Sequence, residues 1–81
     1  MKGIINLPQE LNINSVVKIT DMAKEIMSKE DEIILDAKEV EIIDALGLQI
    51  IFAIQKTAIL NKVKFEVKNA KPALQKYLSY L

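Results

Sequence analysis

The 81-residue sequence contains no cysteine, histidine, arginine or tryptophan. The absence of cysteine excludes disulfides, thiolate zinc sites, iron–sulfur clusters and cysteine nucleophiles. The absence of histidine removes the imidazole general base and the commonest transition-metal ligand. Eleven lysines balance eleven acidic residues, so the chain lacks the basic surface and the bidentate guanidinium contacts of nucleic-acid-binding proteins. We therefore expect no nucleic-acid partner.

Glycine is scarce, with only Gly3 and Gly47 in the chain, and there is no glycine-rich phosphate loop. Carboxylates suit hard cations, but the spacing of the acidic residues from Asp36 to Asp44 matches no calcium loop. No pair of carboxylates is accompanied by groups that would position a substrate. We expect no enzyme activity, no metal and no other cofactor. Gly47 instead indicates close packing of a helix start against a neighbouring element.

Long apolar runs are missing as well. The longest candidate, Ile42 to Ile54, is interrupted by Asp44, Gly47 and Gln49, and it falls short of the roughly 20 residues of a membrane span. The apolar run within Met1–Asn6 is too short for a secretory signal. We therefore expect a cytoplasmic protein without direct membrane insertion.

Aliphatic side chains, by contrast, are abundant. Apolar residues make up 51% of the chain and include 13 isoleucines and 9 leucines, which is enough for one packed core. Residues 1–81 are therefore expected to form a single domain.

Charge is distributed unevenly along the chain. Glu30 to Asp44 holds seven acidic residues against one lysine, and Lys56 to Lys76 holds six lysines against one glutamate. These segments form either two solvated faces or a bipolar surface that steers a partner or promotes head-to-tail association into a weak homodimer.

Hydrophobic periodicity predicts the elements of the first half. A strand from Gly3 to Leu7 is stopped by Pro8, and Gln9–Ile13 is a candidate partner strand. A surface helix follows, capped by Asn14 or Ser15. Its apolar stripe consists of Val16, Ile19, Ala23, Ile26 and Met27.

The second half alternates strands and helices. The unbroken run Ile33–Leu35 predicts a central strand buried on both faces. A helix from about Ala45 to Asn61 precedes a half-exposed strand, Val63–Lys68, and a final helix that begins at Pro72 carries Leu74, Tyr77, Leu78 and Leu81. The order predicts an α/β fold with a mixed, mostly parallel sheet of about four strands and three or four helices.

The helix from about Ala45 carries two apolar stripes, whereas a helix packed on a sheet needs only one. The first stripe comprises Leu46, Ile50, Ala53, Ile54, Thr57 and Leu60. The second comprises Leu48, Ile51, Phe52, Ala58 and Ile59. The stripe that faces away from the sheet is covered in part by the final helix, is covered by a protein partner, or stays uncovered. Periodicity does not decide which stripe that is.

The segment Ile33–Asp36, followed by Val40 and by Ile42–Leu48, resembles the central motif of STAS domains, the anti-sigma factor antagonist family. Leu7–Leu11 resembles the first hairpin of that family. Lys64–Asn69, followed by Lys71–Ala73, is similar to its last strand and the entry to its last helix. With glutamine at position 49, the motif is most similar to that of the members found beside chemotaxis and two-component genes.

The resemblance implies a regulatory site that is altered here. In regulatory members, the serine after the motif aspartate is phosphorylated by a partner serine kinase that doubles as the anti-sigma factor. The matching position is Ala45, which has no hydroxyl. The next hydroxyl, Thr57, lies about three turns further along the helix. The protein is then either locked in its partner-binding state or controlled in another way.

The function implied is a non-catalytic protein–protein interaction module in bacterial signalling and transcription regulation. Its partner would be an anti-sigma factor, a serine kinase or a related regulator, bound through the start of the second helix. On the family's alignment, Leu48, Ile51 and Phe52 face the sheet. The expected partner-binding set is Asp44, Ala45, Leu46, Gln49, Ile50, Ala53 and Thr57. The alternative is a small STAS subunit on the ATPase of a lipid-transporting ABC system.

Overall fold

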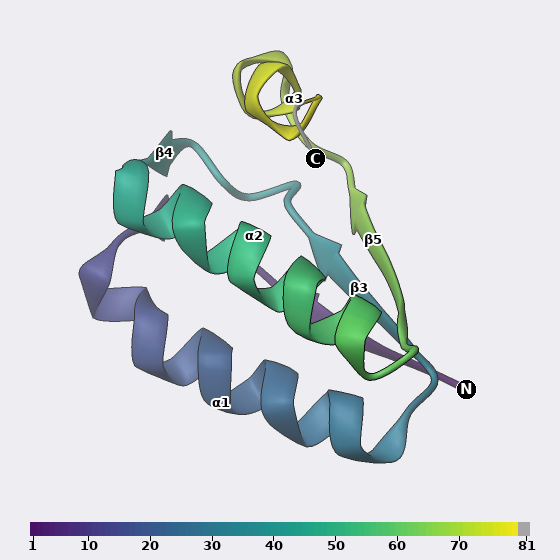
Figure 1. Ribbon diagram of the computed structural model, residues 1–81. Helices are drawn as coiled ribbons and strands as arrows, with labels where there is room; N and C mark the ends of the chain where they lie inside the picture. Colours follow the sequence, from purple (N-terminus) through teal and green to yellow (C-terminus); the bar gives the residue numbers. More distant parts are fainter. Residues whose placement is uncertain (80–81) are drawn as a thin grey trace.

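Two long helices and a parallel sheet make up most of the fold (Figure 1). The computed structural model describes residues 1–79 of the chain. The elements are β1 (Lys2–Asn6), β2 (Glu10–Leu11), α1 (Ile13–Lys29), β3 (Glu32–Asp36), β4 (Ile42–Ile43), α2 (Ala45–Leu60), β5 (Lys64–Lys68) and α3 (Pro72–Leu78). The predicted α/β class is confirmed, while the expected place of Leu81 in the last helix lies outside the described residues. Within residues 1–79, no helix is both long enough and apolar enough to cross a bilayer.

The main sheet has the strand order β1–β3–β5, and both pairings are parallel. Each crossover, first through α1 and then through α2, moves the chain one strand further in the same direction. Because such crossovers are right-handed, both helices must lie on one face of the sheet, where they pack against each other (Figure 1). The residues Ile33, Ile34 and Leu35 of the central strand β3 are at most 1% exposed, which confirms the predicted buried strand.

The structure has a second, two-stranded ladder where we expected one mixed sheet that begins with a hairpin. Strand β2 pairs in parallel with β4 and does not pair with β1. After β1, the amide of Leu7 still donates to the Asp36 carbonyl at 2.9 Å, and the chain then turns away at Pro8, which has no N–H to continue the ladder. The carbonyl of Gln9 accepts instead from the amides of Glu41 and Ile42, at 2.9 and 3.1 Å.

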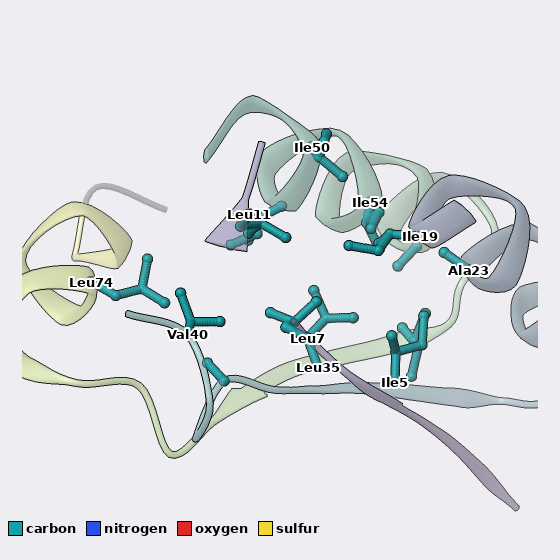
Figure 2. Packing of buried hydrophobic residues seen from close by; sticks show 14 of the residues in the cluster. Ile5, Leu7, Leu11, Ile19, Ala23, Leu35, Val40, Ile50, Ile54 and Leu74 are labelled. Atoms are coloured by element: carbon teal, nitrogen blue, oxygen red, sulfur yellow. The ribbon is translucent and has the colours of Figure 1, made fainter. Parts of the chain in front are cut away.

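The core lies between the sheet and the two long helices. Figure 2 shows Ile5 of β1, Leu7 just after it and Leu35 of β3 on one side of the core, opposite Ile19 and Ile54 on the helices. Buried aliphatic surface of this kind is the main stabilising contribution to a small domain. Leu74 extends the core to α3, which lies at one end of the sheet (Figure 2).

Helix α1 has the predicted apolar stripe, but it begins earlier than expected. Its residues Ile19 and Ala23 are buried, and the other three members of the stripe, Val16, Ile26 and Met27, pack against the core. The N-cap is Asn12 and not Asn14 or Ser15, because the Asn12 side chain accepts from the Asn14 amide at 2.9 Å.

The buried arc of α2 differs from both predicted stripes. Its buried side chains are Ile50, Ile51, Ile54 and Ala58, two from each stripe. The reason is that α2 packs against α1 as well as against the sheet, so its buried face points between the two. Of the three residues expected to face the sheet, Ile51 is buried in the core and Leu48 packs against the core, whereas Phe52 is half-buried and does not belong to the core cluster.

We predict that Leu35→Ala lowers the free energy of unfolding by about 2–5 kcal/mol, because it leaves a cavity at the centre of the core. The matched control is Leu60→Ala at the end of α2, where the side chain is 74% exposed and the change should stay within about 0.5 kcal/mol. Urea unfolding followed by circular dichroism measures both. Equal decreases in the free energy of unfolding for the two variants would show that Leu35 is not at the centre of the core.

Candidate functional site

The start of α2 is held by its capping residue. The Asp44 carboxylate accepts a hydrogen bond from the Gly47 amide at 2.8 Å, and the Asp44 amide donates to the Leu11 carbonyl at 3.3 Å. A carboxylate at this position satisfies a free N–H of the first turn and interacts favourably with the helix dipole. Although Asp44 is exposed, its side chain is therefore engaged in starting the helix.

Gly47 packs directly against the backbone of β2, as the sequence predicts. A Cβ atom at this position would overlap the carbonyl oxygen of Leu11 and would lie 2.9 Å from its carbonyl carbon. Backbone atoms cannot move away as the end of a side chain can. Glycine is therefore the residue that allows the first turn of α2 to approach β2 this closely.

The expected partner-binding residues lie along the outer side of α2. Six of the seven are exposed: the capping residue Asp44 and, on the helix itself, Ala45, Leu46, Gln49, Ala53 and Thr57. Leu46 is the large apolar member, with 44% of its surface exposed. Ile50 is the exception, because it is only 8% exposed and belongs to the core cluster.

An apolar groove separates this side of α2 from α1. It has a volume of about 310 Å³. Helix α2 contributes Leu46, Gln49, Ile50, Ala53, Ile54 and Thr57 to its walls, and α1 contributes Val16, Thr20, Ala23, Lys24 and Met27. The α1 wall was not predicted from the sequence as part of a site, although Val16, Ala23 and Met27 belong to the predicted apolar stripe of that helix. We refer to this feature below as the α1–α2 groove.

A smaller hollow lies on the other side of the helix start. It measures about 220 Å³ and is lined by Ile43, Asp44, Ala45, Leu48 and Tyr77. Ala45 therefore lies on the α3 side of the helix start, while Leu46 lies on the α1 side. The candidate surface wraps around the first turn of α2.

The carboxylates near this end of the sheet are occupied by structural contacts. Asp36 accepts from the Lys38 amide at 3.0 Å and from the Asn69 side chain at 3.1 Å, and these bonds hold its pKa below the usual value. The Gln9 side chain and Lys71 likewise lower the pKa of Glu41. Among residues 1–79, no three acidic side chains are grouped so that they could hold a metal ion.

The family model described as the STAS domain matches residues 2–81. The chain belongs to the STAS domain family. The search of curated proteins found no match. A solved structure described as "Crystal Structure Analysis of Mglu" superposes with a TM-score of 0.78 at 15% sequence identity, covering 88% of this chain and 18% of the other. This chain thus spans about 18% of the length of that protein, and the likeness shows the fold alone.

STAS domains in general are interaction modules associated with signalling or with transporters, and they generally bind other proteins. In this STAS domain, the segment from Asp36 to Leu48 runs from the end of β3 through β4 into the first turn of α2. The segment includes the capping residue, the glycine contact and the exposed Ala45 and Leu46.

We predict that Gly47→Ala destabilises the domain by about 1–3 kcal/mol, because the new methyl group collides with the Leu11 backbone. Helix propensity alone gives the opposite sign, since alanine in a helix is favoured over glycine by about 1 kcal/mol. The matched control is Ala53→Gly on the exposed side of the same helix, which should cost about the propensity difference. A stabilised Gly47→Ala variant in urea unfolding would refute the close contact.

Proposed function

We propose that this STAS domain is a non-catalytic interaction module of the anti-sigma factor antagonist type in cytoplasmic bacterial signalling. Its partner is an anti-sigma factor, a serine kinase or a related regulator. The observation that supports the proposal is the exposure of the expected partner-binding side chains along the outer side of α2. There, Ala45, Leu46, Gln49, Ala53 and Thr57 are exposed on a helix whose opposite side fills the core.

The composition of this side fits a protein interface. Exposed apolar side chains beside polar ones are typical of partner-binding patches on small domains. Leu46 offers an apolar contact, and Gln49 offers hydrogen bonds one turn further on. The first turn is positioned independently of these side chains, by the Asp44 cap and the Gly47 contact.

Ala45 accounts for the missing phosphorylation switch. It is the first residue of α2 and is exposed, so a serine here would be accessible to a kinase. Its methyl group cannot accept a phosphoryl group. A phosphate here would place about −1.5 to −2 charges beside the exposed Leu46. The module therefore acts without the serine switch and is regulated by its abundance or by another partner.

We predict that Ala45→Asp weakens partner binding by more than tenfold, or more than about 1.4 kcal/mol, because a carboxylate would have to be desolvated in an apolar interface. The fold should persist, since acidic residues are tolerated in the first turn of a helix. The partner is first captured from the native host and identified by mass spectrometry. Titration calorimetry then compares the wild type, Ala45→Asp and the control Lys68→Asp on β5.

Two outcomes would overturn the proposal. Equal affinities for the wild type and Ala45→Asp, with both proteins folded, would place the interface elsewhere. Capture of the ATPase of a lipid-transporting ABC system would replace the signalling role with the transport-associated one.

A further inference from the structure

The α1–α2 groove has the length of a helical segment. It runs from Val16 to Met27 on α1 and from Leu46 to Thr57 on α2, which corresponds to about three turns, or roughly 16 Å, on each wall. A second hollow of about 170 Å³, lined by Lys24, Met27, Ser28, Thr57 and Asn61, continues from the far end of the groove. The two hollows share Lys24, Met27 and Thr57, so together they form one elongated feature between the helices.

The floor of the groove is apolar. It is made by Ala23, Ile50 and Ile54, all of them buried. Thr57 also presents little free polarity, because its hydroxyl donates to the Ala53 carbonyl at 2.9 Å. An occupant must therefore bring apolar side chains to most of the groove.

Charge enters the groove at one position. Lys24 is the only charged residue in its lining, and within residues 1–79 it takes part in no ion pair. Ser28 and Asn61 in the adjoining hollow make the same end polar. The groove is thus uncharged near Leu46, where Gln49 also lines it, and basic near Lys24, and the complementary occupant carries an acidic group at one end only.

The described part of the chain offers no free helix of its own that fits. Helix α3 has only seven residues, and its Leu74 is buried in the core. The apolar stripe of α1 and the buried arc of α2 are also part of the core. A second copy of residues 1–79 therefore has no unoccupied amphipathic helix to place in the groove.

We propose that the α1–α2 groove binds an amphipathic helix of a protein partner. The helix has about three to four turns, an apolar stripe with i, i+3/i+4, i+7 spacing and an acidic residue opposite Lys24. Such a helix packs its ridge of side chains between two parallel helices and covers the exposed Leu46. This inference rests on the proposed function and adds the α1 wall to the partner-binding surface.

A synthetic peptide tests the proposal. The probe is a capped helical peptide of about 14 residues with a leucine stripe and glutamates in its first turn, and its control carries lysines in place of the glutamates. Binding to the full chain is followed by fluorescence anisotropy, and the site by amide chemical shifts in ¹⁵N-labelled protein. We expect the acidic peptide to bind more tightly and to shift Thr20 and Ala53.

Charge reversal decides the role of Lys24. Lys24→Glu should lower the affinity for the acidic peptide about fivefold and raise the affinity for the basic peptide. The matched control is Lys18→Glu, an exposed α1 position outside the groove lining, which should leave both affinities unchanged. Ala53→Glu should abolish binding of the acidic peptide.

Several results would overturn the proposal: no peptide binding, no charge preference, or an unchanged preference in Lys24→Glu. Dodecanoate binding where neither peptide binds would assign the groove to a small amphiphile. Self-association that protects Thr20 and Ala53 would assign it to a second copy. Ala45 lies outside the groove, so Ala45→Asp tests the proposed function separately. If that variant weakens the native partner while the peptide fails to bind, the proposed function stands and the groove helix does not.

Discussion

The candidate surface depends on one close contact, in which the first turn of α2 lies against the backbone of β2 with no room for a side chain at Gly47. The contact fixes where α2 begins. Asp44 then caps the helix and also hydrogen-bonds to Leu11 of β2. Because the first turn of α2 is positioned by its contacts with the backbone of β2, Ala45 and Leu46 stay exposed and do not contribute to its position.

The second determinant is topology. Two right-handed crossovers in the same direction place α1 and α2 side by side on one face of the sheet. The buried face of α2 must then serve both the sheet and α1, which is why it cuts across the two apolar stripes of the sequence. The short side chains Ala23 and Ala53 leave the seam between the helices incompletely filled, and the α1–α2 groove results.

Several elements of the fold and of the candidate site were predictable from local sequence patterns. The unbroken run at Ile33–Leu35, the α1 stripe and the significance of Gly47 depend on neighbours close in sequence or on steric demands of a single residue, and the structure confirms them. The inward face of α2 was not predictable, because it depends on how α1 packs beside it. The pairing of β2 with β4 was missed because strands of two residues carry too little periodicity to identify a partner.

We propose that the outer side of α2 and the facing wall of α1 together form the partner surface of this STAS domain. The most direct measurement is amide chemical-shift mapping of the ¹⁵N-labelled chain with its captured native partner. We expect the largest changes in chemical shift between Ala45 and Thr57 and on the turns of α1 around Thr20. Changes confined to the opposite face of the sheet, around the exposed Ile4 and Glu66, would contradict it.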